Sequence, residues 1–365
     1  MKVKLEDVCE RGSSNLKLSD VENSSGEFPI YGASGYIGNV DFYHQDKKYV
    51  AVIKDGAGVG RTTLHPAKSS VIGTMQYLIP KDNIIPEYLY YVVRNMHLEK
   101  YYTGATIPHI YFKDYKNEKF NLNSIDKQRE IVNILNKCEK IIIKRQNQLK
   151  SLDELVRARF VEMFGTLHDN ENGFDVVTID DVCSLIKDGT HQTPQYTEDK
   201  ESGYKFLSSK DVMSQKIDWS DIKYIPADLH EQLYKTLKPQ RNDILMSKNG
   251  VNYGVAAVND TDEVFDIYVS LALLRPKEVI NSIFFRCAIN NQETKLQFNS
   301  SIKGIGVPNL HLGEIRKTKI FLPPIELQNQ FADFVQQVDK SKSAIKKSLE
   351  ETQILFDSLM QKYFG

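Results

Sequence analysis

Residues 124–165 contain a heptad pattern that restricts the fold more than any other part of the chain. The apolar positions alternate at spacings of four and three residues, and neither glycine nor proline occurs from Ile125 to Phe164. Such a pattern, held for about five heptads, predicts a long helix that pairs with another helix. From Lys127 to Met163 the helix would be about 55 Å long, so we expect a partner. Its seam residues are Ile131, Leu135, Cys138, Ile142, Leu149, Leu152, Val156 and Met163.

The partner is found in the same chain, because residues 324–365 repeat this segment at an offset of 200. Gln128 recurs as Gln328, and the Phe-Gly that ends the first copy also ends the second. Two unrelated amphipathic helices are the alternative, but internal repeats generally mean repeated structural units. We therefore expect an antiparallel coiled coil. The second seam consists of Phe331, Val335, Val338, Ile345, Leu349, Phe356, Leu359 and Tyr363.

The repeat extends beyond the helices, with matching segments in the same order in both halves. The sequence predicts a globular domain at 1–123, a helix at 124–166, a second domain at 167–323 and a helix at 324–365. Within each domain, short strands and one helix indicate a mixed α/β (α+β) fold. The two halves of the chain would be related by a pseudo-twofold internal repeat. The matches are 5–9 with 179–183, 54–56 with 248–250, 78–82 with 274–278, and 104–110 with 304–310.

Composition excludes several classes of protein. The 47 basic and 48 acidic residues give a net charge of −1, which argues against coating nucleic acid by charge alone. The four cysteines lack Cys-x-x-Cys spacing, so neither a zinc site nor a disulfide framework is indicated. No signal peptide or membrane-length apolar run is present. We expect a cytoplasmic protein without a membrane association.

We find no motif for catalysis. Residues 56–62 resemble a phosphate-binding loop, but the outer glycines are one residue too close and Arg61 replaces the required lysine. A glycine-rich turn between two strands explains them better. Asp180 and Asp181 lie at a predicted helix start, where they suit capping. The chain is expected to bind and not to catalyse.

The arrangement resembles the specificity subunit of Type I restriction-modification enzymes. The resemblance covers essentially the whole chain. It is carried by Gln128 and Gln328 in their helix-opening segments, by the glycine-to-proline runs before each helix, and by residues 188–194 followed by 206–211. It implies two target-recognition domains, each reading one half of a split double-stranded DNA site. It also implies two modification subunits as partners, which carry the methyl donor, and restriction subunits bound through them. This chain would itself bind no cofactor or metal.

Candidate DNA-contacting residues lie in polar turns and loops that the two halves share. Asparagine and arginine suit contacts with base edges, whereas lysine and hydroxyl groups more often hold phosphate. For each residue, a solvated turn position is the alternative. The candidates are Lys54, Arg61, Thr62, Thr63, His109 and Tyr111 in the first half, and Lys187, Thr190, His191, Gln192, Thr193, Lys210, Lys248, Asn249, Asn252, Tyr253, Asn309 and His311 in the second.

Two modules at the ends of paired helices would contact DNA at two places separated by an unread gap. A spacer of about 50 Å corresponds to at most about 15 base pairs. Two other functions remain open at this point: a coiled-coil scaffold with protein-binding domains, and an enzyme such as a nuclease. A specificity subunit of a related methylation system outside Type I is a further alternative.

Overall fold

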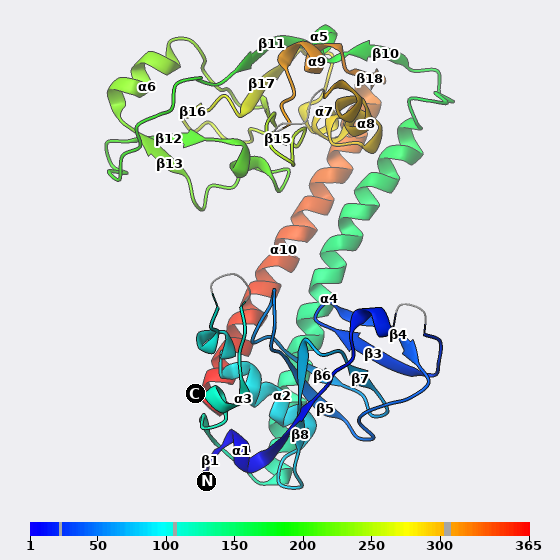
Figure 1. Ribbon diagram of the computed structural model, residues 1–365. Coiled ribbons are helices and arrows are strands. Elements are labelled where there is room, and N and C mark those ends of the chain that lie inside the picture. Colours follow the sequence, from blue (N-terminus) through cyan, green and yellow to red (C-terminus); the bar gives the residue numbers. More distant parts are fainter. Residues whose placement is uncertain (22–23, 105–107, 303–307) are drawn as a thin grey trace. The chain divides into compact units, whose positions relative to one another are not determined.

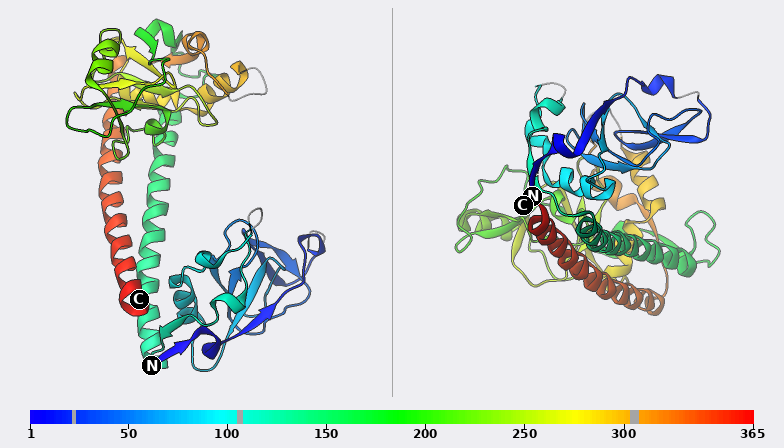
Figure 2. Two further views of the ribbon diagram at one scale, coloured as in Figure 1. Left: turned by 60° about the vertical axis from the view of Figure 1, so that its left-hand side comes forward. Right: turned by 90° about the horizontal axis from the view of Figure 1, so that it is seen from below.

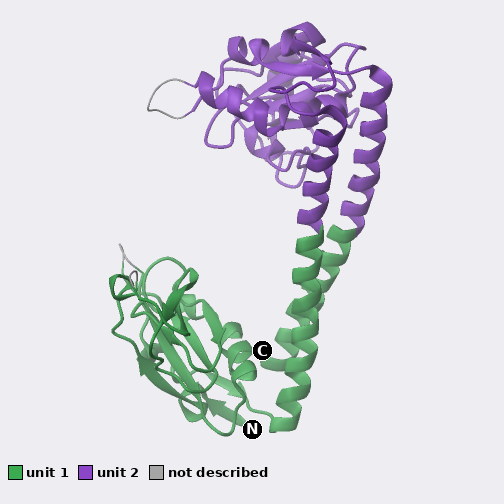
Figure 3. Ribbon diagram, turned by 90° about the vertical axis from the view of Figure 1, so that its right-hand side faces the viewer, with its two compact units in different colours: residues 1–148, 345–365 green, residues 149–344 purple. Residues whose placement is uncertain are grey.

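The computed structural model describes residues 1–21, 24–104, 108–302 and 308–365. The chain divides into two compact units, drawn in two colours in Figure 3. Unit 1 contains residues 1–148 and 345–365, and unit 2 contains residues 149–344. Each long helix contributes one part to each unit. Parts of the glycine-rich runs before the long helices, at 105–107 and 303–307, lie outside the described residues.

Unit 1 is built from small, mostly antiparallel sheets and short helices (Figure 1). A four-stranded sheet has the order β2-β8-β5-β6, and a three-stranded sheet has the order β4-β3-β7 with β3 and β7 parallel. The terminal strands β1 and β9 pair and close the domain before the long helix. The elements are β1 (Lys2–Lys4), α1 (Leu5–Val8), β2 (Cys9–Ser13), η1 (Leu18–Asp20), β3 (Phe28–Gly32), β4 (Gly35–Val40), β5 (Tyr49–Ile53), β6 (Thr62–His65), β7 (Ser70–Val71), β8 (Met75–Pro80), α2 (Pro86–Asn95), η2 (Leu98–Tyr101), α3 (Phe112–Tyr115) and β9 (Lys119–Asn121).

Unit 2 repeats this plan with larger insertions. Its sheets have the orders β11-β17-β14-β15 and β13-β12-β16, and β10 pairs with β18. Again one pair of the three-stranded sheet, β12 with β16, is parallel. The elements are β10 (Asp175–Thr178), α5 (Ile179–Val182), β11 (Cys183–Asp188), β12 (Tyr204–Leu207), η3 (Ser209–Val212), β13 (Lys223–Ile225), α6 (Ala227–Tyr234), β14 (Ile244–Ser247), β15 (Ala256–Val258), β16 (Phe265–Ile267), β17 (Leu271–Pro276), α7 (Ser282–Ile289), α8 (Gln292–Ser301), α9 (Leu312–Lys317) and β18 (Lys319–Leu322).

The expected internal repeat is confirmed down to single hydrogen bonds. Lys81 N–H donates to the carbonyl of Val8 at 2.9 Å, and Lys277 N–H donates to that of Val182, the matching residue, at 2.8 Å. The capping expected at the start of α5 is present, because the Thr178 side chain accepts from the Asp181 amide in a capping box. Helices α6 and α8 were not predicted from the sequence.

The long helices α4 (Ile125–Phe164) and α10 (Ile325–Phe364) run side by side in Figures 1 and 2. In unit 1 the start of α4 packs with the end of α10, and in unit 2 the end of α4 packs with the start of α10. The pairing is therefore antiparallel, as the heptads predict. In the part of the chain that the structure describes, no helix is both long and apolar enough to span a membrane.

The seam is most tightly buried near the helix ends, where the helices also contact the domain cores. Buried seam residues are Ile131, Leu135, Cys138, Phe331, Val335, Val338 and Phe356. The other seam residues are partly buried, namely Ile142, Leu149, Leu152, Val156, Met163, Ile345, Leu349, Leu359 and Tyr363. Aromatic residues outside the predicted seam extend these contacts, since Phe160 and Phe164 pack against Phe331.

One buried glutamine fastens each helix to its domain. The Gln128 amide accepts from Ile85 N–H at 2.9 Å and donates to the carbonyls of Asn83 and Asn123. Gln328 accepts from Asn281 N–H at 2.9 Å and donates to two equivalent carbonyls. Both side chains are fully buried. A long apolar residue would fill the same space but would leave backbone groups unpaired.

We expect Gln328→Leu to destabilise unit 2 by about 2–4 kcal/mol, because buried backbone groups lose their partners. The only tryptophan of the chain, Trp219, packs against Phe265 in unit 2. Its fluorescence during urea unfolding therefore reports on that unit. Gln128→Leu should leave this transition unchanged and raise amide hydrogen exchange in unit 1. The exposed Gln146→Leu is the control, and an equal shift for all three variants would contradict the prediction.

Candidate nucleic-acid interface

A tight turn follows β5 and is held against the segment that precedes α3. Gly56 N–H donates to the carbonyl of Pro108 at 2.9 Å, and Ile110 N–H donates to that of Lys54 at 2.9 Å. The turn closes on itself through Gly60 N–H and the Ile53 carbonyl, at 2.8 Å. The turn at 54–61 and the segment at 108–111 thus form one frame, which we call turn frame 1.

The same frame recurs in unit 2 after β14. Gly250 N–H donates to the carbonyl of Pro308 at 3.0 Å, and Leu310 N–H donates to that of Lys248 at 2.8 Å. Gly254 N–H closes the turn on Ser247 at 2.7 Å. Turn frame 2 therefore comprises 248–255 and 308–311. The two frames share a backbone but differ in most side chains.

Glycine is required in these turns for two different reasons. Gly56 and Gly60 both have positive φ, +82° and +85°, which disfavours other residues. A Cβ at Gly56 would meet open space, whereas one at Gly60 would lie 2.5 Å from the Glu99 backbone nitrogen. Gly60 thus allows the turn to pack directly against η2.

We expect Gly60→Ala to disrupt turn frame 1 much more than Gly56→Ala does. The left-handed conformation alone costs about 1–2 kcal/mol, and Gly60→Ala adds a clash with backbone that cannot move away cheaply. Amide exchange of residues 54–61 should rise strongly in Gly60→Ala and only slightly in the matched Gly56→Ala. Equal exchange in the two variants would argue against this packing.

The candidate residues of turn frame 1 differ in their access to a ligand. Arg61 is exposed, with a guanidinium nitrogen donating to the Ala33 carbonyl. Lys54 is half-buried, and burial together with repulsion by Arg11 lowers the pKa of its ammonium group. Thr62 is buried, and Thr63 bonds His65 Nε2 at 2.8 Å. Arg61 is the most available of the four.

His109 and Tyr111 complete turn frame 1 from the opposite segment. His109 Nδ1 pairs with Asp55, an acidic partner that the sequence analysis missed. The Tyr111 ring lies edge-on to His109 at 4.1 Å and is 48% exposed. Lys113 lies above the same ring, at 5.0 Å from its centroid. An exposed ring beside an imidazole and an ammonium group suits stacking on a base and contact with phosphate.

In turn frame 2, Lys248 does not face solvent. Its side chain is 6% exposed and its ammonium group pairs with Asp188, which also lies 3.6 Å from His191. In this conformation Lys248 holds the turn and does not offer a free ammonium group to phosphate. Its direct contact with DNA stays a prediction that would require the Asp188 pair to open.

The remaining side chains of turn frame 2 are more open. Asn252, Asn309 and His311 are exposed. Asn249 is half-buried, and its side-chain oxygen has no hydrogen-bond partner among the described residues. Tyr253 is braced by α8, because Lys295 lies 3.5 Å from its ring centroid and Asn299 accepts from its hydroxyl at 2.7 Å. Lys295 was not among the predicted site residues, because no helical pattern marks the segment that carries it.

The loop after β11 lies next to turn frame 2 through the Asp188 pair. His191, Gln192 and Thr193 are exposed. Thr190 is half-buried, with its amide bonded to the Ile267 carbonyl at 2.9 Å. Lys187 is exposed and donates to the Thr236 carbonyl at 2.8 Å. The structure therefore brings this loop and turn frame 2 together in unit 2.

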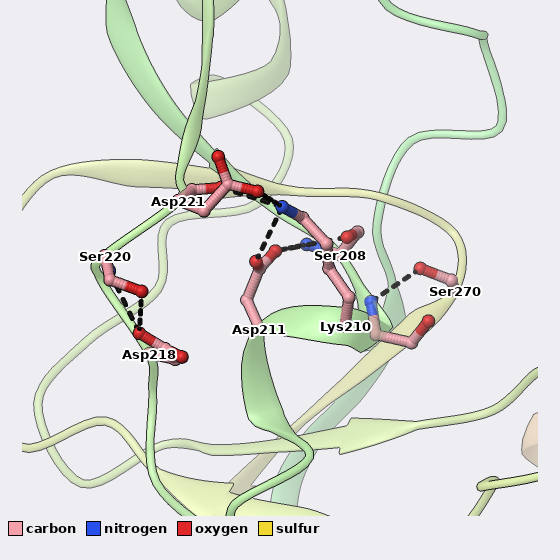
Figure 4. A network of polar contacts seen from close by, with 8 residues as sticks. Ser208, Lys210, Asp211, Asp218, Ser220, Asp221 and Ser270 are labelled. Carbon is pink, nitrogen blue, oxygen red and sulfur yellow. Dashed lines mark hydrogen bonds and ion pairs between the residues drawn. The ribbon is translucent and has the colours of Figure 1, made fainter. Parts of the chain in front are cut away.

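Lys210 belongs to a separate polar network, drawn in Figure 4. Its ammonium group lies 2.6 Å from Asp221 and 3.7 Å from Asp211. Hydrogen bonding to Asp221 raises the pKa of Lys210 and lowers that of Asp221. The charge of Lys210 is thus neutralised locally, and contact with DNA stays a prediction for this residue.

Each unit thus presents a rigid backbone frame with exposed side chains that can donate to base edges or phosphates. A family model, the Type I restriction modification DNA specificity domain, matches residues 1–152 and 171–354. The chain belongs to this family. The two matched ranges contain turn frames 1 and 2 respectively.

Two Type I specificity subunits are similar to this chain over most of its length. The Type I restriction enzyme MjaVIII specificity subunit of Methanocaldococcus jannaschii is 23% identical over 322 residues, covering 83% of this chain and 75% of the relative. The MjaIX specificity subunit of the same organism is 21% identical, covering 78% of this chain and 69% of the relative.

Solved structures share the fold over the whole chain. The S subunit of a Type I restriction-modification system from M. genitalium is 16% identical with a TM-score of 0.65, covering 100% of this chain and 96% of the other. A chain of a type I R-M system, studied for its complex assembly and conformational transition, is 17% identical with a TM-score of 0.54, covering 100% and 97%.

Proposed function

We propose that this chain is the non-catalytic, DNA-reading subunit of a Type I restriction-modification complex. Each unit would bind one half of a bipartite, asymmetric target in double-stranded DNA. The observation that carries the proposal is the repeated turn frame: the same backbone hydrogen bonds hold both turns, while the side chains on them differ. A common frame with different side chains suits two modules that read different base sequences.

In each frame the backbone would hold the turn and the side chains would contact DNA. The backbone amides and carbonyls of each turn bond to one another, so the exposed side chains remain free for base edges and phosphates. Arg61 and Tyr111 would serve in unit 1, and Asn252 and Asn309 in unit 2. Asp55 and Asp188 would orient the basic groups beside them and would also exclude non-specific phosphate contact.

Methylation and cleavage would come from partner subunits. Two modification subunits would bind this chain and supply the methyl donor, and restriction subunits would join through them. The nearly balanced charge of the chain fits this division, because partners would supply much of the contact with phosphate. The chain itself would bind no cofactor. Among the described residues, no cluster of three His, Cys, Asp or Glu side chains could hold a metal ion.

Methylome sequencing of cells that express this chain with its modification subunits tests the proposal. We expect one split, asymmetric motif, methylated only when this chain is present. Omission of the modification subunits is the control. Methyl transfer or cleavage by this chain alone would contradict the non-catalytic assignment, and methylation without any split motif would contradict the role in recognition.

A further inference from the structure

Unit 2 contains a cavity of about 460 Å³ between its part of the helix pair, α7 and the segment 213–216. This volume falls in the range of small-molecule sites. Its apolar wall comes from Val156, Phe160, Val161, Met213 and Val335. The cavity is separate from turn frame 2, which contributes none of the lining residues.

Charge in the cavity is unbalanced. Lys342 pairs with Asp153, and Lys216 pairs with Asp339 at 3.2 Å. Two guanidinium groups that line the same cavity, those of Arg157 and Arg286, have no carboxylate within 4 Å among the residues described. The lining therefore carries an excess of two positive charges.

Arg286 is the decisive residue, because it is only 8% exposed. One of its nitrogens donates to the Gln215 carbonyl at 3.3 Å, and another contacts Cys287 Sγ at 3.6 Å. Its Nε is buried and has no hydrogen-bond partner in the described chain. A guanidinium group stays charged in proteins, and buried charges are normally paired. The carboxylate of Asp339 acts on this charge from beyond ion-pair distance and is already paired with Lys216 at 3.2 Å. The Arg286 guanidinium therefore has no ion-pair partner of its own among the described residues.

At the matching place in unit 1, the arginine is paired with a carboxylate and aromatic rings fill the space. There Tyr91 donates to Glu139 at 2.7 Å, and Arg94 forms an ion pair with the same carboxylate. The Arg94 guanidinium also lies 5.1 Å from the ring centroid of Phe356. Aromatic rings and a paired charge occupy this place in the first copy.

Unit 2 lacks the rings of Tyr91 and Phe356, because smaller residues stand at the two matching positions. Val156 stands at the position of Phe356, by the offset of 200. Cys287 stands at the position of Tyr91, counted from the backbone amides of Asn281 and Ile85 that bind the two anchoring glutamines. The loss of both rings leaves apolar space next to an unpaired guanidinium.

We propose that this cavity binds a small organic carboxylate with an aromatic or similarly bulky apolar body. The carboxylate would pair with Arg286, and the apolar body would lie against Val156 and Phe160 where unit 1 carries rings of its own. The amino end of α8, with Asn291 as its cap, opens at the same rim and favours negative charge.

Calorimetric titration of the full-length chain with 3-phenylpropionate tests this site, with the neutral 3-phenylpropanamide as the matched compound. We expect the carboxylate to bind at least about tenfold more tightly, because only it can form a charge-assisted pair. It should also slow alkylation of Cys287, which lines the cavity, whereas Cys9, Cys138 and Cys183 are buried. Equal affinity for the two compounds, or absence of binding by the carboxylate, would overturn the proposal.

Two variants separate a binding role from a structural one. Val156→Phe restores the ring of unit 1 and should abolish binding while Trp219 fluorescence and urea unfolding stay unchanged. Arg286→Met should remove the preference for the carboxylate over the amide. The exposed Arg129→Met on α4 is the control and should bind normally. Retention of the full preference in both cavity variants would overturn the assignment.

Discussion

Duplicating one heptad in each long helix is expected to lengthen the unread gap of the DNA target by about three base pairs. The duplicated segments would be 142–148 in α4 and 338–344 in α10, which end at the boundary between the two units. Seven residues add about 10 Å of helix, and one base pair occupies about 3.4 Å. The seam keeps its phase, because Ile142 and Leu149 are one heptad apart, as are Val338 and Ile345.

Methylome sequencing gives the motif before and after the change. Both half-sites should stay the same while the gap grows. Duplication in α4 alone is the control, since it shifts one helix against the other and should abolish methylation. New half-sites with an unchanged gap would show that the helices do not set the spacing.

Replacing exposed side chains of one turn frame is expected to affect one half-site only. Asn252→Ala with Asn309→Ala should reduce methylation by about ten- to a hundredfold and relax base preference in the half read by unit 2. A good bidentate contact with a base is worth about 1–3 kcal/mol. The half read by unit 1 should keep its preference.

The matched pair in unit 1, Arg61→Ala with Tyr111→Ala, should show the reverse pattern. Methylation rates on oligonucleotides with single base changes in either half distinguish the two outcomes. Lys47→Ala, at an exposed residue of unit 1 outside turn frame 1, serves as a control for general loss of positive charge. Loss of preference in both halves from either pair would contradict a separate reader in each unit.

The long helices and the repeat could be predicted from the sequence because both depend on regular spacing. Heptads describe local geometry, so the antiparallel pairing of α4 and α10 followed from periodicity and the offset of 200. Gln128 and Gln328 were visible as a recurring pair. Their role as buried anchors was not, because two of the three backbone groups that each glutamine satisfies lie more than 40 residues away.

Site residues were harder to judge because residue type does not reveal accessibility. Lysine is a residue type that often contacts phosphate, yet Lys248 is buried and pairs with Asp188, 60 residues earlier in the chain. Lys210 is compensated in the same way by Asp221. Arg61, Asn252 and Asn309 remain exposed, as a DNA contact requires.

The order of residues was enough to predict the architecture: two copies of one domain, each followed by a long helix, in a family that recognises DNA. Periodicity and repetition carry that information because they depend only on the order of residues. The folded chain was needed to show which polar side chains are free, why a Cβ at Gly60 would clash, and that Arg286 has no ion-pair partner among the described residues. Those properties depend on distances between residues far apart in the chain, and the folded backbone sets such distances.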